Sequence, residues 1–583
     1  MKRLLYIFLI LVGSLQFFSC ANEDYFLEKR LGSDVIVDSI FTTKQKSMVA
    51  IAQAYAMSLQ SGITIKQWDN NRTNGLRGGT LSHLSGEVNA LKFSWQDAWK
   101  IQRSGMTANE GDGKPLSTDG FVFNYQTIRQ CYLVIDNIDK VVDLTPTEKK
   151  AVKAEMLTLI AYRYQEMFKR YGGVPIVDKL LDVNSQAIPR ATLKQTLDHI
   201  ITLCDAALTD LPDTYNSTNK GRVTKGIPLC IKAEALMFAA RPLFNTATPY
   251  MSLGANNNLI CLGTEDPSLW QKAVEANLEV LNWAIANGYA IINTGNPFKD
   301  YGTAVATPNN QEVLLAFKSQ QRMNDYDPHT QEGGANAMSY LQLTHYYKAD
   351  GTEQQWAAEQ WQPYNDFVQK AGEMEARYKV SVAIAGQQAW NNPDSYNWST
   401  HALYNASNWD GGSGGTEGAG RRVKFYYMAD TRDWFEFPLY RLAEFYLNLA
   451  EPYNELGNPS KALEYLNVIH TRAGLPAITE TNKEKLRAIV QREWAIEFYE
   501  ENHRLFDVKH WKLNNLGDGV IGGDKKGVVF QYASGRNNGE NPWDYLSYAV
   551  RTVYVGYWAN NQYLDPFPIA EINKGYIIQN PGY

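Results

Sequence analysis

Tryptophans are concentrated in one part of the chain, between residues 356 and 409. Five of the chain's 15 tryptophans fall within these 54 of its 583 residues. The faces of sugar rings stack on aromatic side chains, which offer large and rigid contact surfaces. Asparagines lie among the tryptophans, and their amides both donate and accept hydrogen bonds. This combination predicts a surface that binds carbohydrate.

A second group of aromatic and polar residues lies nearer the N-terminus, and one further tyrosine falls in a loop between the two groups. Packing of a loop onto a scaffold explains any one of these tryptophans equally well, so both interpretations stay open. The predicted ligand-binding residues are Trp68, Asn70, Arg72, Arg77, Trp95, Tyr326, Trp356, Trp361, Trp398 and Trp409. Tryptophans on predicted helices are expected in the core instead, namely Trp270, Trp283, Trp494 and Trp511.

Residues with catalytic potential are present, but their surroundings argue against catalysis. Ser413 lies at the centre of a G-x-S-x-G match, yet no strand precedes it and no helix follows, as a nucleophile elbow requires. His503 and Asp507 are four residues apart, and packing near a helix end explains them better than a catalytic pair does. No phosphate-binding or H-E-x-x-H motif occurs. We therefore predict a protein without catalytic residues.

Metal binding has only weak support in the sequence. Asp69, Asp325 and Asp327 offer the oxygen ligands that calcium prefers, but their spacing is not that of an EF-hand loop. We expect no cofactor, and calcium stays an open alternative without assigned ligands.

The N-terminus resembles a bacterial lipoprotein signal. Lys2 and Arg3 precede an apolar stretch over residues 4–18, which is short for a membrane span and typical of a secretory signal peptide. Cys20 follows a small residue at the cleavage position, so we predict removal of residues 1–19 and lipidation of Cys20. Several acyl chains anchor a protein more firmly than one does. The alternative is an ordinary signal with an incidental cysteine.

Helical periodicity dominates the rest of the chain, and we predict a mainly α fold. Strand patterns are few and short, at 312–317 and 554–555, and long loops are expected at 62–95, 318–354 and 383–421. The predicted helices cover 43–59, 124–142, 147–171, 192–211, 227–244, 267–287, 436–456, 459–473 and 482–511.

Residues 450–463 carry the small and aromatic spacing of a tetratricopeptide repeat, in which two antiparallel helices stack on neighbouring pairs. A run that begins at Trp270 resembles the second helix of another such unit. An array of helix pairs is favoured over a single hairpin.

Composition excludes several classes of protein. Hydrophobic residues make up 44% of the chain and charged residues 20%, which is typical of a globular protein. The formal net charge of -6 gives no basic footprint for nucleic acid. Beyond Cys20 the cysteines are widely spaced, and we favour buried free thiols over disulfides at Cys131, Cys204, Cys230 and Cys261.

An ordered series of short motifs resembles the SusD/RagB family of outer-membrane nutrient-binding lipoproteins. The series includes residues 170–175, 239–245, 437–451, 471–476 and 503–507, and it ends with residues 567–573 and 579–583. Pro452 departs from the family pattern, which usually has alanine there, and a proline inside a helix either breaks or bends it. The resemblance extends over nearly the whole mature chain.

The resemblance implies a tetratricopeptide-like helix-pair scaffold, a SusD-like α/α superhelix, with a loop-rich half that carries the ligand site. It also implies a glycan or oligosaccharide ligand and a SusC-like TonB-dependent transporter as partner. The location would be the outer membrane of a Gram-negative bacterium, facing the exterior, and Glu23 and Asp24 resemble the acidic tag of surface lipoproteins. The motif residues Arg492, Glu493 and Glu497 are expected on one helix face, paired with Arg441 or Arg472.

We divide the chain into a signal peptide (1–19), a lipidated tether (20–42), an N-terminal helical region (43–300) and a C-terminal region with ligand loops (301–583). Two alternative functions stay open. One keeps the family with a peptide ligand, as in a RagB-like member. The other is an α/α-toroid glycoside hydrolase, which needs two carboxylates across a cleft.

Overall fold

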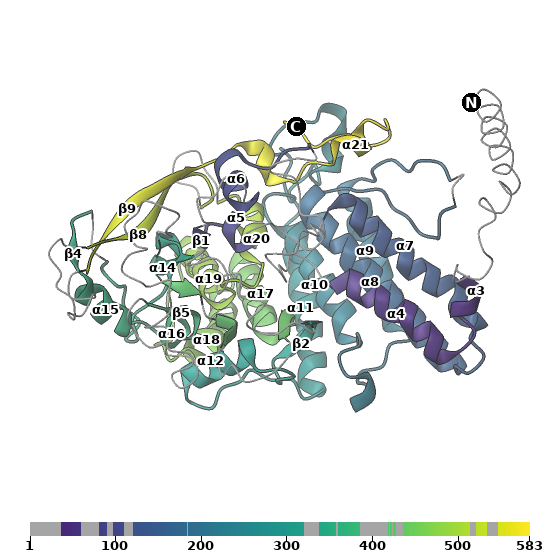
Figure 1. Cartoon of the computed structure of the whole chain (residues 1–583), viewed down its shortest axis with the longest axis horizontal. Helices are drawn as coiled ribbons and strands as arrows, with labels where there is room; N and C mark the ends of the chain where they lie inside the picture. The colour runs from purple at the N-terminus through teal and green to yellow at the C-terminus, as the bar shows by residue number, and fades with distance from the viewer. Residues whose placement is uncertain are drawn as a thin grey trace, which may run out of the picture.

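The structure is a computed structural model. It describes residues 37–59, 81–89, 97–109, 120–182, 185–319, 337–356, 359–384, 418, 420–422, 424–426, 435–513, 520–532 and 546–583. Within these residues helices predominate, as predicted (Figure 1). No described helix is both long and apolar enough to cross a membrane.

The N-terminal helices lie alongside one another on one side of the molecule, where α4, α7, α8 and α9 pack together (Figure 1). Helix α8 is nearly all buried and contacts α4, α7, α9 and α10. It begins with Pro146 after a capping box formed by Thr145 and Glu148, as the sequence pattern predicts. These helices are α3 (Val37–Ile40), α4 (Lys44–Leu59), α7 (Phe121–Asn137), α8 (Pro146–Tyr171), α9 (Leu193–Leu208), α10 (Gly226–Ala240) and α11 (Ser268–Ala286).

The end of α8 depends on two glycines. Gly172 has a φ of +79°, which a residue with a side chain rarely adopts. At Gly173 a Cβ atom would lie 2.1 Å from the backbone oxygen of Ala191. The backbone N–H of Gly173 donates to the carbonyl oxygen of Leu259 at 2.7 Å. The glycines therefore let the chain turn sharply against its neighbours.

Helix pairs continue into the C-terminal half. Helices α10 and α11 pack as one pair, α17 (Leu442–Glu455) and α18 (Pro459–Arg472) pack as another, and α11 contacts α17. A separate hydrophobic cluster joins α17, α18 and α19 (Lys483–Glu497). These contacts confirm the predicted array of helix pairs.

Three small antiparallel sheets accompany the helices. One has the strand order β1-β3-β6-β5, a second pairs β2 with β7, and the third has the order β4-β9-β8 and extends away from the helices (Figure 1). The strands are β1 (Val88–Asn89), β2 (Val313–Ser319), β3 (Ala337–Met338), β4 (Gln362–Pro363), β5 (Val382–Ala383), β6 (Arg421–Arg422), β7 (Phe435–Arg441), β8 (Gly523–Tyr532) and β9 (Leu546–Gly556).

The other helices of the described residues are short. They are α5 (Leu81–Leu84), α6 (Asp97–Ser104), α12 (Pro297–Ala306), α14 (Tyr340–His345), α15 (Tyr364–Gly372), α16 (Ala376–Ser381), α20 (Arg504–His510) and α21 (Ile569–Ile572). The 3₁₀ turns are η1 (Ile138–Lys140), η2 (Ser217–Asn219), η3 (Gly254–Leu259), η7 (Lys424–Tyr426) and η9 (Asn560–Tyr563).

Four expectations need correction. Residues 435–441 form strand β7 rather than the start of a helix, because they pair with β2 in an antiparallel register. The helix predicted over 482–511 is two helices, since Glu500 and Asn502 adopt positive φ angles of 64° and 67°. The loops predicted over 62–95 and 318–354 contain regular structure, namely α5 and β1 in the first and β3 and α14 in the second, and the strands β8 and β9 are longer than the few short strands predicted.

Other expectations are confirmed. Cys131, Cys204, Cys230 and Cys261 are buried free thiols. Helix α17 continues through Pro452 to Glu455, so the proline does not end it. Of the tryptophans expected in the core, Trp494 and Trp511 are buried, whereas Trp270 and Trp283 are only partly buried.

Candidate functional site

Two of the predicted ligand residues lie within the described part of the chain. Trp356 is partly buried and packs on Phe367, with ring centroids 5.4 Å apart, which favours a core role. Trp361 is 42% exposed, and the guanidinium carbon of Arg551 lies 5.5 Å from its ring centroid. It adjoins strand β4, so Trp361 offers a surface ring that a ligand can reach.

The remaining predicted residues lie outside the described residues, and their roles stay predictions. They are Cys20, Trp68, Asn70, Arg72, Arg77, Trp95, Tyr326, Trp398 and Trp409. The same holds for Ser413 and for the aspartates considered for calcium, Asp69, Asp325 and Asp327. Over the described ranges, no group of three or more His, Cys, Asp or Glu side chains could hold a metal ion.

Three of the segments that carry these residues, those with Trp95, with Tyr326 and with Trp398 and Trp409, have described ends in one sheet. Asn89 pairs with Ala337, and Arg421 pairs with both Ala337 and Ala383. Strand β1 ends at Asn89, strand β3 begins at Ala337, and strands β5 and β6 lie before and after residues 385–417 in the sequence. Chain segments far apart in sequence are anchored within a few residues of one another.

This sheet is attached to a hydrophobic cluster and to a buried carboxylate. Val88, Met338 and Val382 are fully buried in the second hydrophobic cluster. The Glu87 carboxylate accepts hydrogen bonds from the Ser85 hydroxyl at 2.7 Å and from the backbone N–H of Glu500 at 3.0 Å. Burial raises the pKa of Glu87 to about 7, although both hydrogen bonds lower it. Glu87, which directly precedes strand β1, is thus partly protonated near pH 7.

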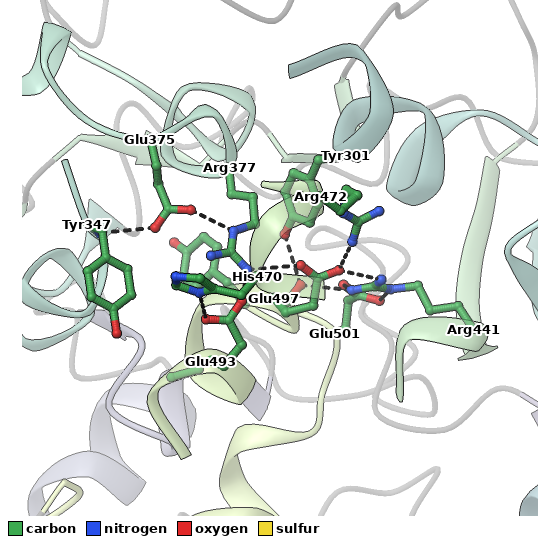
Figure 2. A network of polar contacts seen from close by, with 12 residues as sticks. Tyr301, Tyr347, Glu375, Arg377, Arg441, His470, Arg472, Glu493, Glu497 and Glu501 are labelled. Atoms are coloured by element: carbon green, nitrogen blue, oxygen red, sulfur yellow. Dashed lines mark hydrogen bonds and ion pairs between the residues drawn. The ribbon is translucent and has the colours of Figure 1, made fainter. Parts of the chain in front are cut away.

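A network of buried charges lies in the interior where α16, β7, α18 and α19 come together (Figure 2). Glu497 is its centre, because its carboxylate meets three guanidinium groups. Arg441 donates to Oε1 at 2.7 Å, Arg377 donates to Oε2 at 3.2 Å, and Arg472 also donates to Oε1. All four side chains are almost completely buried.

One side of the network joins α16 to α18 and α19. Arg377 donates to Glu375 and to Glu493, both at 2.6 Å. Glu493 also contacts Nδ1 of His470 at 2.9 Å, and the backbone N–H of Tyr347 donates to Glu375 at 3.0 Å (Figure 2). Arg377, which belongs to the loop-rich half, is therefore bound directly to Glu493 of the helix-pair scaffold.

The other side joins strand β7 to the turn after α19. Arg441 donates to both oxygens of Glu501, at 2.7 and 2.9 Å, and to Glu312 at 3.1 Å. Lys424 of η7 donates to Glu501 at 2.6 Å. Glu312 also accepts from Arg472 at 3.2 Å, which closes the network.

The electrostatics of this network favour charged carboxylates. Burial alone raises the pKa of Glu497, but Arg472, Arg441 and Arg377 outweigh it and hold that pKa well below its usual range. Burial likewise raises the pKa of Glu493, and Arg377 and His470 lower it to about 2. Glu493 and Glu497 are therefore held in their charged forms, whereas burial raises the pKa of Glu375 at the edge of the network.

The predicted pairings are partly confirmed. Glu497 pairs with Arg441 and Arg472 as expected, whereas Glu493 pairs with Arg377 and His470 instead. Arg492 turns away from the network. Its guanidinium donates to the backbone oxygen of His345 and lies 3.8 Å from the ring centroid of Tyr347.

Sequence reasoning missed Arg377 and Lys424, which belong to no family motif. Only the excess of unpaired acidic residues among Glu493, Glu497 and Glu501 signals that further cations are needed. His503 and Asp507 do not form a pair. Asp507 accepts from Arg241 at 2.7 Å, and the His503 ring lies against Phe498, with centroids 4.8 Å apart.

Comparison with known proteins identifies the family. A family model described as the SusD family matches residues 286–583, more than half of the chain. The chain belongs to the SusD family. A second model, described as starch-binding and associating with the outer membrane, matches residues 43–229. No curated protein matches the sequence.

Solved structures of other SusD-like proteins share the fold. A SusD-like protein from Bacteroides fragilis has a TM-score of 0.69 and 21% identity, with 94% of this chain and 98% of that chain covered. A SusD-like carbohydrate binding protein from the same species has a TM-score of 0.67 and 18% identity, with coverages of 92% and 99%. At these identities the likeness establishes the fold of this chain and not its ligand.

We predict that Glu497→Gln destabilises the protein strongly. Removing one partner of a buried ion pair costs about 3–5 kcal/mol, because the remaining charges stay buried without compensation. Glu464→Gln is the matched control, since Glu464 is 54% exposed and its pair with Lys461 is worth about 0–1 kcal/mol. Urea unfolding followed by circular dichroism measures both. Equal effects of the two substitutions would contradict a stabilising role for the network.

Glu87→Gln should change stability in a pH-dependent way. The folded state of the wild type binds the Glu87 proton more tightly than the unfolded state, so wild-type stability rises as pH falls from about 7 towards 4.5. Glutamine cannot ionise, so the variant lacks this dependence. The free energy of unfolding of the variant minus that of the wild type should be larger above pH 7 than near pH 4.5, by up to about 3 kcal/mol. Thermal unfolding at the two pH values measures it. A gain that does not vary with pH would contradict the raised pKa.

Proposed function

We propose that this protein is a surface-exposed lipoprotein that binds a glycan or oligosaccharide and delivers it to a SusC-like TonB-dependent transporter. The observation that carries the proposal is the SusD family match over residues 286–583, a range that includes every predicted ligand residue from Tyr326 onwards. The SusD-like protein described as carbohydrate binding and the second family model, described as starch-binding, support a carbohydrate ligand.

The membrane location in this proposal comes from the N-terminus. Lipidation of Cys20 would attach the chain to the outer membrane, and the second family model is described as associating with that membrane. In this proposal the segment predicted as a tether, residues 20–42, would link the lipid to the folded part of the chain.

Ligand capture in this proposal uses stacking and hydrogen bonds, without catalysis. Three of the segments with predicted ligand residues are anchored at the sheet of β1, β3, β5 and β6, which brings their starting points together. Tryptophan rings on these segments would stack on sugar rings, and asparagine and arginine side chains would bind hydroxyl groups. Release to the transporter would follow when the protein closes on it as a lid.

Calorimetric titration of residues 21–583 with starch, xylan, mannan and pectin oligosaccharides tests the proposal. We expect saturable heat with one glycan class. Trp398→Ala and Trp409→Ala should each weaken binding about tenfold or more, the equivalent of about 1.4 kcal/mol. Trp270→Ala on α11 is the control and should leave the affinity unchanged.

Other outcomes of this titration would contradict the proposal. Heat that continues after each injection would indicate turnover and favour a glycoside hydrolase. Silence with every glycan, together with saturable heat from a peptide mixture, would favour a peptide-binding member of the family.

A further inference from the structure

A polar cleft opens on the helix-pair scaffold, away from the residues discussed above. Its volume is about 430 Å³, which is within the range of about 300–1,000 Å³ typical of ligand pockets. Three segments form it: the loop around η2, the end of α11 and strand β2, which lies near the lower edge of the view in Figure 1. Its walls include Asp213, Tyr215, Tyr289, Asn309, Lys318 and Glu436.

One wall presents an exposed lysine that a nearly buried carboxylate holds in place. Lys318 and Glu436 are opposite each other in the register of β2 and β7, and their charged atoms are 2.5 Å apart. The Glu436 side chain is only 8% exposed, whereas Lys318 is 40% exposed. Both Glu436 oxygens are already occupied, one by Lys318 and the other by the backbone N–H of Asn309, so the exposed ammonium group of Lys318 is the part of this pair that can donate to a sugar hydroxyl.

Backbone geometry holds this pair in place. Asn309 has a φ of 54°, which is uncommon for a residue with a side chain. Its N–H donates to Glu436 at 2.8 Å, and its side-chain oxygen accepts from Lys318 at 3.2 Å. Across the cleft Gly221, with a φ of +95°, leaves room for the Lys318 side chain, which a Cβ would meet at 3.2 Å.

The opposite wall carries aromatic rings whose positions are fixed by ring packing and by hydrogen bonds. Tyr289 lies over Trp283, with ring centroids 5.6 Å apart and planes inclined by 31°. The Trp283 indole N–H donates to Asp213 at 2.9 Å. The hydroxyl of Tyr215 donates to Glu155, so this ring is also held in one position. Rings that are already immobilised lose little conformational entropy when a ligand binds.

The charges around the cleft are largely balanced by near neighbours. Arg222 pairs with the buried Glu155 at 2.7 Å, and Asp213 lies 3.4 Å from Lys225. Lys318 pairs with Glu436 as described. Lys220 adds an exposed cation to the lining of the cleft, so the ligand class is taken from the proposed function and not from the charge of the cleft.

We propose that this cleft is a second carbohydrate-binding site, which takes a short, uncharged oligosaccharide. The ligand class rests on the proposed function, while the location rests on the cleft alone. Tyr289 would supply the stacking surface, and Lys318, held in place by Glu436, would donate to a hydroxyl group of the ligand. Two sites on one molecule would let it hold a long glycan at separated positions, which raises the effective concentration at each.

Hydrogen–deuterium exchange of residues 21–583, with maltoheptaose, xylohexaose and mannohexaose as probes, tests this proposal. Whichever probe binds in calorimetry should slow exchange in residues 213–224, 287–289 and 309–318. Lys318→Ala should abolish this protection and lower the affinity of this site about tenfold, the equivalent of about 1.4 kcal/mol. The protection elsewhere should persist. Lys461→Ala, which removes a similar exposed ion pair with Glu464, is the matched control.

Tyr289→Ala gives a second variant that should also lose protection in the cleft. Binding of a probe without slower exchange in these three segments would overturn the second site and leave the proposed function intact. Protection that survives both Lys318→Ala and Tyr289→Ala would also overturn it. Absence of binding by all three probes would overturn the second site, whereas the proposed function would fail only if the pectin oligosaccharides of the calorimetric panel were also silent.

Discussion

The compensation of buried charge at the centre of the C-terminal half constrains the rest of the structure. Moving a charged group from water into a protein interior costs several kcal/mol per ion, so such groups persist only with well-placed partners. Here the single carboxylate of Glu497 forms ion pairs with three guanidinium groups. The carboxylates of the network are Glu312, Glu375, Glu493, Glu497 and Glu501, and its cations are Arg377, Lys424, Arg441 and Arg472, with His470 at its edge.

These partners come from elements that are distant in the sequence, and each must reach the same place. Helix α16 and turn η7 belong to the loop-rich half, whereas α18 and α19 belong to the helix-pair scaffold. A displacement of α16 would leave Arg377 or Glu493 buried without a counter-charge. The network therefore fixes the loop-rich half on the scaffold, and the sheet that anchors the candidate ligand segments sits in the same hydrophobic cluster as Tyr346 and Tyr378.

The scaffold was largely predictable from sequence, because helical periodicity and capping signals are local. Pro146 and Gly172 mark the two ends of α8 correctly. Local patterns failed where tertiary pairing decides the conformation. Residues 435–441 form a strand because they pair with β2. The break between α19 and α20 depends on positive φ angles that no local sequence motif predicts.

The candidate sites were less predictable for a physical reason. A tryptophan in a loop has the same sequence signature whether it packs on the scaffold, as Trp356 does, or faces solvent, as Trp361 does. The cleft beside β2 had no signature at all, since Tyr289, Asn309 and Lys318 are brought together only by the fold. Arg377 was missed for the same reason.

A double-mutant cycle between Arg377 and Glu493 tests most directly whether the network holds the two halves together. The free energy of unfolding would be measured for Arg377→Met, Glu493→Gln and the double variant. The network account predicts that the two losses are not additive and that the coupling energy is in the range of about 0.5–3 kcal/mol found for interacting residues. Losses that add to within about 0.3–0.5 kcal/mol would show that these side chains act independently and would contradict the account.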